Sequence, residues 1–252
     1  MAQPRCRSVL ITGCSRGIGL GLVRGLAAAS PSPDLVFATC RYPEKAQRHL
    51  TCVRSKSPCV VVCPKAASAS EVEEIVGDKG LNCLINNAGI NVLASLEEVT
   101  AETMLTIYET NTVAHNLWFS QAFLPLLRKA AQLGTGMGCH RAAIINMSSL
   151  AASMQLVQAN EMFLKVYPYR IAKTALNMIT RCLAADLKSD GILCISLHPG
   201  WLQTDMGGNM VSVSAGNVTV QEAIPGILSV LDRLGEKENG SFLDWQGETL
   251  PW

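Results

Sequence analysis

Short runs of β-branched and other apolar residues alternate with longer segments whose apolar residues recur at helical spacing. This alternation restricts the fold more than any other feature, because strands separated by helices pair in parallel and the helices cover both faces of the sheet. We expect strands over residues 9–11, 35–38, 59–63, 83–85, 143–147 and 193–197, and helices over 17–29, 71–76, 101–128, 169–188 and 221–234. The pattern predicts an α/β fold, a Rossmann-type doubly wound parallel sheet flanked by helices.

Composition and charge exclude two classes of partner. The 252 residues are 48% hydrophobic and 16% charged, a balance that suits a chain with a large buried core. Because 21 lysines and arginines stand against 20 acidic residues, the net charge of +1 gives no cationic surface for nucleic acid or an anionic membrane. No run reaches the roughly 18 apolar residues of a membrane-spanning helix. We therefore expect neither a nucleic-acid nor a membrane partner.

No repeat, charged tail or flexible linker divides the chain, so residues 1–252 are predicted to form a single domain. The ten cysteines are scattered and no signal peptide precedes them, which indicates reduced thiols in a cytoplasmic protein. The nearest pair, Cys59 and Cys63, has neither a second pair nor a histidine at ligand spacing, so no metal site is predicted.

A glycine-rich segment, TGCSRGIG at residues 12–19, follows the first predicted strand and opens the first predicted helix. Glycines let the chain turn sharply and let a pyrophosphate approach main-chain N–H groups at the positive end of a helix. The segment predicts a phosphate-binding loop, although glycines after a strand often form only a turn. Its predicted cofactor-binding residues are Gly13, Ser15, Arg16, Gly17, Ile18 and Gly19.

The end of the second predicted strand decides the type of dinucleotide. An acid about 20 residues beyond the glycines usually bonds the ribose 2′-OH of NAD, but here the chain continues Cys40-Arg41 and the next carboxylate is Glu44. Arg16 and Arg41 together would hold a 2′-phosphate, because a planar guanidinium matches phosphate oxygens. The residues favour NADP(H); the alternative is two solvated surface arginines.

Tyr169 and Lys173 lie one helical turn apart, so the phenol and the ammonium share a face of the predicted helix. A cation about 4 Å from the phenol at an effective dielectric constant of about 20 is worth roughly 4 kcal/mol, enough to lower the phenol pKa by about three units. The pair is a candidate proton donor. In isolation, a Tyr/Lys pair on a helix is more often an exposed pair of side chains with no catalytic role.

Ser148 and Ser149 follow the predicted strand over residues 143–147, at the edge of the sheet where the ligand cleft is expected. A hydroxyl there would face a bound substrate. Two serines at a strand end also commonly form a turn or cap the next helix.

Taken together and in this order, the glycine segment, Asn86-Asn87-Ala88-Gly89, Asn111, Ser149, Tyr169 with Lys173, and His198-Pro199-Gly200 with Thr204 resemble the short-chain dehydrogenase/reductase family. They span most of the chain. The finer pattern at residues 38–41, 167–170, 177–180 and 239–242 resembles the sniffer-type carbonyl reductases and the C-factor-like proteins.

The resemblance implies an NADPH-dependent reduction of a ketone, aldehyde or quinone carbonyl to an alcohol. Ser149 would bond the carbonyl oxygen, Tyr169 would protonate it, Lys173 would lower the phenol pKa and hold the nicotinamide ribose, and Asn111 would position a relay water. The further implied cofactor-binding residues are Asn87, Ala88, Gly89, Pro199, Gly200 and Thr204. Two alternatives remain: Asn111 is an ordinary helix asparagine, and Pro199-Gly200 is a turn. His198 is expected to be a structural residue.

The sequence departs from the family in three places. Cys63-Pro64-Lys65 follows the third strand where an acid usually bonds the adenine, and the helix at 71–76 is short, so the adenine side of the site is altered. Ser149 and Tyr169 are 20 positions apart, a longer gap than usual. The extra loop at 150–166 would shape the substrate wall with Leu156, Val157, Met162, Phe163 and Leu164, and if it displaces Ser149, then Ser148 or Ser153 would replace it.

A substrate lid is expected around residues 205–220, where Met206, Met210, Val211 and Val213 favour an apolar carbonyl substrate. A loop packed on the core would look the same. Two main functions remain open: an active NADPH-dependent carbonyl reductase, and an NADP(H)-binding sensor or scaffold that keeps the fold with little turnover. A third, an NAD-dependent alcohol oxidation, would need an acid directly after the second strand, where none is found. A homo-oligomer paired through the helices at 101–128 and 169–188 is compatible with either.

Overall fold

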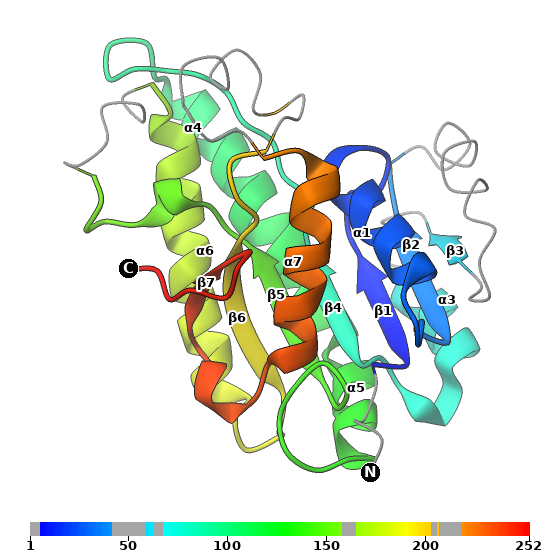
Figure 1. The fold of residues 1–252 in the computed structure, drawn as a ribbon. Coiled ribbons are helices and arrows are strands. Elements are labelled where there is room, and N and C mark those ends of the chain that lie inside the picture. The colour runs from blue at the N-terminus through cyan, green and yellow to red at the C-terminus, as the bar shows by residue number, and fades with distance from the viewer. Residues whose placement is uncertain (1–5, 42–58, 63–67, 158–164, 203–205, 207–217) are drawn as a thin grey trace.

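The computed structural model describes residues 6–41, 59–62, 68–157, 165–202, 206 and 218–252. Their centre is a seven-stranded, fully parallel sheet in the order β3-β2-β1-β4-β5-β6-β7 (Figure 1). The strands are β1 Ser8–Ile11, β2 Leu35–Thr39, β3 Cys59–Val62, β4 Cys83–Asn86, β5 Ala143–Met147, β6 Leu193–His198 and β7 Phe242–Asp244. The predicted fold class is confirmed.

The six predicted strands are present, with ends that differ by a residue or two. The prediction missed β7, a three-residue strand that pairs with β6 at the edge of the sheet, because so short a segment shows no periodicity. The predicted end of the third strand at Cys63 lies outside the described residues.

The helices form two layers, one on each face of the sheet (Figure 1). On one face, α1 packs against α7; on the other, α6 packs against α4 and η2, and α3 against α5. Their bounds are α1 Gly17–Ala28, α3 Ser68–Val76, α4 Ala101–Tyr108, the π-helical segment η2 Glu109–Trp118, α5 Phe119–Gln132, α6 Tyr167–Asp186 and α7 Val220–Arg233, with short 3-10 turns η1 Gly77–Lys79, η3 Leu150–Ala152 and η6 Glu236–Glu238.

Three predicted helices differ from the structure at their ends or along their length. The helix expected over 101–128 is three consecutive segments, α4, η2 and α5, which end at Gln132. The helix expected from Tyr169 begins at Tyr167, since Pro168 is tolerated in a first turn. The helix expected over 71–76 begins at Ser68 and is prolonged by η1, so it is less short than the sequence indicated.

The alternation of side chains along β1 explains why its run is apolar throughout. Val9 and Ile11 belong to the core beneath α1 and α7, whereas Leu10 belongs to the core beneath α3, α5 and α6. A parallel strand covered on both faces needs apolar residues at every position.

The strand order changes direction at β1: β2 and β3 follow on one side of it, and β4 to β7 follow on the other. In open α/β sheets, ligands bind at the carboxyl ends of the strands beside such a point. The glycine segment after β1, Asn87 after β4, Ser148 after β5 and Pro199 after β6 all lie at that edge.

Most of the predicted lid around 205–220 falls on residues 203–205 and 207–217, which lie outside the described residues. Within the described ranges, Val218 forms a bridge with Leu202 and leads into α7 at Val220. No helix in these ranges is long and apolar enough to span a bilayer.

Candidate active site

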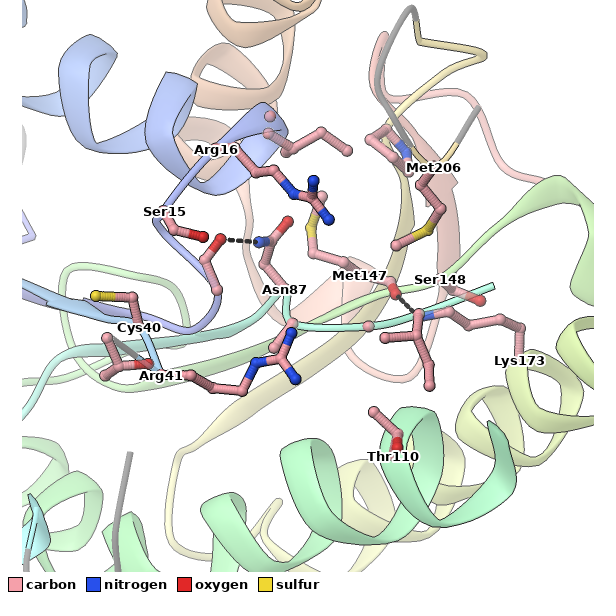
Figure 2. Close-up of a pocket in the computed structure, with 18 of the residues that line it drawn as sticks. Ser15, Arg16, Cys40, Arg41, Asn87, Thr110, Met147, Ser148, Lys173 and Met206 are labelled. Atoms are coloured by element: carbon pink, nitrogen blue, oxygen red, sulfur yellow. Dashed lines mark hydrogen bonds between the residues drawn. The ribbon is translucent and has the colours of Figure 1, made fainter. Parts of the chain in front are cut away.

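A cavity of about 380 Å³, here called the first cavity, opens at the carboxyl edge of the sheet (Figure 2). Twelve predicted site residues line it, together with seven other described residues, among them Ser148, the predicted alternative to Ser149, and Met206 of the predicted lid. The predicted ones are Gly13, Ser15, Arg16, Gly17, Ile18, Arg41, Asn87, Ala88, Gly89, Tyr169, Lys173 and Pro199; the others are Thr39, Cys40, Ile90, Thr110, Met147, Ser148 and Met206.

Four predicted site residues do not line the first cavity, and one is outside the described ranges. Gly19 is buried beneath the glycine segment, Asn111 is fully buried in η2, and Ser149 and Gly200 lie beside the lining residues. Thr204 lies outside the described residues, between Leu202 and Met206.

The glycine segment is fixed against the end of β4. The Thr12 hydroxyl accepts hydrogen bonds from the main-chain N–H groups of Asn87 and Ala88, both at 2.9 Å, and the Asn87 amide donates to the Thr12 carbonyl at 2.8 Å. Gly13 has a φ of +74°, and a Cβ on it would lie 2.9 Å from the Cα of Ala88. Only glycine fits this turn, which brings the chain to the start of α1.

The N-terminus of α1 has no cap of its own. Arg16 occupies the N-cap position without a side-chain cap hydrogen bond, and the first turn contains no acidic residue. The leading N–H groups of the helix therefore keep their partial positive charge at the cavity, an arrangement that suits an anion such as a pyrophosphate.

Two arginines reach the same part of the first cavity from different loops. Arg16 comes from the glycine segment and Arg41 from the end of β2, and Figure 2 shows both side chains extending over the cavity beside Asn87. No carboxylate belongs to its lining in the described part of the chain. The first cavity therefore favours a phosphate group. It disfavours a free ribose 2′-OH, which an acidic residue usually binds.

Lys173 and Tyr169 share one face of α6, with the Lys173 Nζ 5.7 Å from the centre of the Tyr169 ring. Lys173 is 4% exposed, and its Nζ donates to the Met147 carbonyl at 2.6 Å. Burial lowers the pKa of Lys173 to about 8 and raises the pKa of Tyr169 to about 12.

The net shift of the Tyr169 pKa in this structure is upward, and the lowering of that pKa by Lys173 stays a prediction. Burial is the largest cause of the rise, because it disfavours the charged phenolate. A hydrogen bond between the Tyr169 and Ser149 side chains acts in the opposite direction but does not reverse the shift. Tyr169 is consequently a neutral phenol at physiological pH and carries the proton that it would donate.

Of the three candidate serines, Ser149 is the one beside the phenol. Its hydroxyl caps η3 by accepting from the Ala151 N–H at 3.2 Å and also bonds Tyr169. Ser148 donates to the Asn177 side-chain oxygen at 2.7 Å, and Ser153 donates to the Trp252 carbonyl at 3.3 Å. Ser149 is therefore the serine next to Tyr169, whereas Ser148 is the one that lines the first cavity, and the role of Ser149 stays a prediction.

The Asn111 side chain forms hydrogen bonds with main-chain groups, as expected for an ordinary helix asparagine. Its side chain accepts from the Ile90 N–H at 2.8 Å and donates to the Ile90 carbonyl at 2.7 Å, which fastens η2 to the loop after β4. The Asn116 side chain donates to the Asn111 carbonyl at 2.5 Å. The relay-water role of Asn111 stays a prediction.

The extra loop contributes to a different part of the molecule from the one expected. Val157 was predicted to shape the substrate wall, but it lines a second cavity on the far side of α6 together with Met154 and Ala152. Met162, Phe163 and Leu164 lie outside the described residues. His198 is half-buried at the end of β6, and the burial of its ring lowers its pKa to about 4, so it is neutral at physiological pH.

Two lining groups had no signal in the sequence. The Met147 carbonyl, which holds Lys173, is a main-chain atom that any residue would supply. Thr110 lines the cavity from the π-helical segment η2, a local geometry that periodicity does not predict.

Known proteins resemble the chain over most of its length. A sequence model of the short chain dehydrogenase family matches residues 7–215. The C-signal protein of Myxococcus xanthus is 35% identical over 173 residues, which are 68% of this chain and 93% of that protein. The chain therefore belongs to the short-chain dehydrogenase family and is an oxidoreductase of that class.

Solved structures refine the comparison. An NADPH-bound carbonyl reductase from chicken fatty liver is 45% identical, with a TM-score of 0.89 over 98% of this chain and 95% of that one. The carbonyl reductase Sniffer of D. melanogaster is 38% identical, with a TM-score of 0.90 over 98% of this chain and all of that one (100%). The predicted resemblance to the sniffer-type carbonyl reductases is confirmed.

Proposed function

We propose that this protein uses NADPH to reduce the carbonyl group of a ketone, an aldehyde or a quinone to an alcohol. The observation that carries the proposal is the alignment of Ser149, Tyr169 and Lys173 next to a cavity with an uncapped helix N-terminus and two arginines. The similarity to two carbonyl reductases, one of them NADPH-bound, supports it.

The residues of the first cavity fit NADP(H). The N-terminus of α1 and the glycine segment suit the pyrophosphate, since a Cβ at Gly13 would collide with Ala88 and the helix has no side-chain cap. Arg16 and Arg41 suit the 2′-phosphate. When bound, the cofactor supplies the hydride that the carbonyl carbon accepts.

The protein supplies the proton. Tyr169, whose pKa is about 12, holds a phenolic proton at neutral pH and delivers it to the carbonyl oxygen as negative charge develops there. Ser149 donates a hydrogen bond to the same oxygen, and the Lys173 ammonium stabilises the phenolate that remains. Catalysis therefore consists of stabilising a charge that exists fully only in the transition state.

The substrate is a small molecule, and Met206, Ile90 and Met147 at the first cavity favour one with an apolar body. The eight cysteines in the described ranges are all free thiols, which supports a reducing compartment such as the cytoplasm. The same proposal includes three further features: residues 1–252 act as one domain, a substrate lid lies around residues 205–220, and the protein forms a homo-oligomer.

Turnover tests the proposal. The protein is mixed with NADPH and a panel of quinones, aldehydes and aromatic ketones, and the loss of reduced-nicotinamide absorbance is followed. Tyr169→Phe should abolish the loss, whereas the matched change Tyr167→Phe, on a side chain outside the first cavity, should leave it intact. NADPH raising the melting temperature without any turnover would contradict the reductase and favour a sensor or scaffold instead.

A further inference from the structure

Three cysteine side chains meet at the amino edge of the sheet, opposite the edge that carries the first cavity. Cys6 precedes β1, Cys83 is the first residue of β4, and Cys139 lies in the loop before β5. The Cys83 and Cys139 sulfur atoms are 3.9 Å apart, and Cys6 is a second hydrogen-bond partner of Cys83. These three residues are here called the thiol cluster. None of them lines the first cavity.

Hydrogen bonds next to the thiol cluster keep Cys83 and Cys139 together, although 56 positions separate them in the sequence. The Asn82 side chain donates to the His140 carbonyl at 3.1 Å and to the Arg141 carbonyl at 2.8 Å. The residue before Cys83 is thereby bonded to the residue after Cys139. The two sulfur atoms are therefore neighbours wherever the start of β4 and the loop before β5 are folded.

Cys139 is the member of the close pair that a small solute meets first. Cys83 is 1% exposed and Cys139 is 6% exposed. The segment ahead of Cys139, residues 132–136, is exposed and contains Gly134 and Gly136. A partly accessible thiol beside an exposed loop admits a molecule as small as hydrogen peroxide more readily than a bulky reagent.

The direction of the hydrogen bonds distinguishes the three sulfur atoms. Cys83 donates to the Cys139 sulfur, and Cys6 donates to the Ser8 carbonyl at 3.6 Å. Hydrogen bonds to Cys139 and Cys6, and then burial, raise the pKa of the Cys83 thiol, so Cys83 keeps its proton at neutral pH. A donor aimed at the Cys139 sulfur stabilises a thiolate there, and the thiolate is the form of cysteine that attacks an oxidant.

We propose that Cys83 and Cys139 are a reversible oxidation site, at which hydrogen peroxide converts the two thiols into a disulfide. Cys139 is the attacking sulfur and Cys83 the resolving one. Forming the bond shortens the separation of 3.9 Å to about 2.05 Å. The loop before β5 can absorb this movement, because a Cβ at Gly136 would have nothing within 4 Å.

The oxidation takes place in two steps and releases two molecules of water. The Cys139 sulfur attacks hydrogen peroxide: an S–O bond forms, the O–O bond breaks, and the Cys139 proton leaves with the second oxygen as water. The Cys83 sulfur then attacks the Cys139 sulfenic acid: the S–S bond forms, the S–O bond breaks, and the Cys83 proton leaves with the hydroxyl as water. The two sulfur atoms are oxidised and the two peroxide oxygens are reduced.

Two other roles fit the thiol cluster less well. No group of three or more histidine, cysteine, aspartate or glutamate residues in the described ranges is arranged to hold a metal ion. Packing alone is the usual role of a buried cysteine, and Cys194 is an example, since it lies in β6 within the core on the other face of the sheet. A thiol that donates to a second thiol has, in addition, a partner with which it can be oxidised.

Oxidation of the full reduced chain, followed by peptide mass spectrometry, tests the proposal. The chain is treated with hydrogen peroxide, the remaining thiols are alkylated, and the protein is digested without reduction. We expect a cross-linked pair of peptides that contains Cys83 and Cys139 and is two hydrogen atoms lighter than the separate peptides. Dithiothreitol should separate them. Bound NADPH should not change the yield, because the thiol cluster lies outside the first cavity.

Cys83→Ser should lose the cross-link and leave Cys139 as a sulfenic acid that dimedone labels. Cys194→Ser is the matched control, a change at another buried cysteine of a strand, and should leave the cross-link intact. The proposal is overturned if Cys83 and Cys139 both remain alkylatable after peroxide has oxidised the exposed Cys182. A main product that joins Cys83 to Cys6, or loss of the cross-link in Cys194→Ser, would overturn it as well.

Discussion

The Lys173 Nζ donates to the Met147 main-chain carbonyl across 2.6 Å, and this bond ties the helix that carries the proposed proton donor to the end of β5. The carbonyl supports the ammonium, but burial still lowers the pKa of Lys173 to about 8. Since Tyr169 sits one turn earlier on α6, the bond also places the positive charge relative to the phenol. The geometry of the site therefore depends on a main-chain atom of a strand.

The buried lysine makes stability depend on pH. Burial lowers the pKa of Lys173 from 10.5 to about 8, so between these values the unfolded chain binds a proton that the folded chain does not. The contribution of Lys173 to the free energy of unfolding should consequently rise as the pH rises from about 8 to about 10, on the order of 1 to 3 kcal/mol. Urea unfolding at a series of pH values measures this change.

Lys173→Met is the variant that isolates the effect. A methionine of similar length has no proton to lose, so the stability of this variant should lack that rise between pH 8 and 10. A rise of the same size in both proteins would show that Lys173 is not the group responsible. Comparing the two proteins removes the contribution of the other titrating groups.

Regular features of the fold and the spacing of Tyr169 and Lys173 could be predicted from the sequence, because periodicity and helical geometry are local properties. The apolar run of β1 and the one-turn spacing on α6 are examples. The raised pKa of Tyr169 was beyond such reasoning, since it follows from burial by residues distant in the chain. The same holds for Val157, whose side of α6 is decided by how the segment after η3 packs.

The two arginines of the first cavity should decide between NADPH and NADH. Replacing Arg16 or Arg41 with alanine removes a charge-assisted contact to the 2′-phosphate, which is worth about 1.5 to 3 kcal/mol, so NADPH binding should weaken by about ten- to a hundredfold. Binding of NADH should change little. Arg24→Ala, an exposed arginine of α1 outside the first cavity, is the control. Equal losses for the two cofactors would mean that the arginines do not bind the 2′-phosphate.

Gly19 should tolerate no side chain. A Cβ there would collide with the Gly13 carbonyl and lie 2.7 Å from the Asn87 amide nitrogen, so Gly19→Ala would push the glycine segment off β4. We expect Gly19→Ala to lose about 2 to 4 kcal/mol of stability and most NADPH binding. In Gly77→Ala, by contrast, the new Cβ has nothing within 4 Å, so the cost is limited to its positive φ and NADPH binding persists. Thermal melts with and without NADPH compare the two variants.

The two adjacent serines should separate chemistry from stability. Ser149→Ala removes the hydroxyl that bonds Tyr169, so kcat/KM for carbonyl reduction should fall by about a hundredfold while the fold persists. Ser148→Ala removes the donor to the Asn177 oxygen and leaves that buried amide without any partner, so it should cost about 1 to 3 kcal/mol of stability.

Steady-state kinetics at several NADPH concentrations, together with urea unfolding, distinguish the two variants. Because Ser148 also lines the first cavity, Ser148→Ala should raise KM. The fold-change in that KM should be smaller than the fold-change by which Ser149→Ala lowers kcat. If Ser148→Ala instead abolished turnover and Ser149→Ala left it unchanged, the hydroxyl at the reacting carbonyl would be that of Ser148. The hydrogen bond from Ser148 to Asn177 would then have to break in the working enzyme, at the cost of leaving the Asn177 amide unpaired.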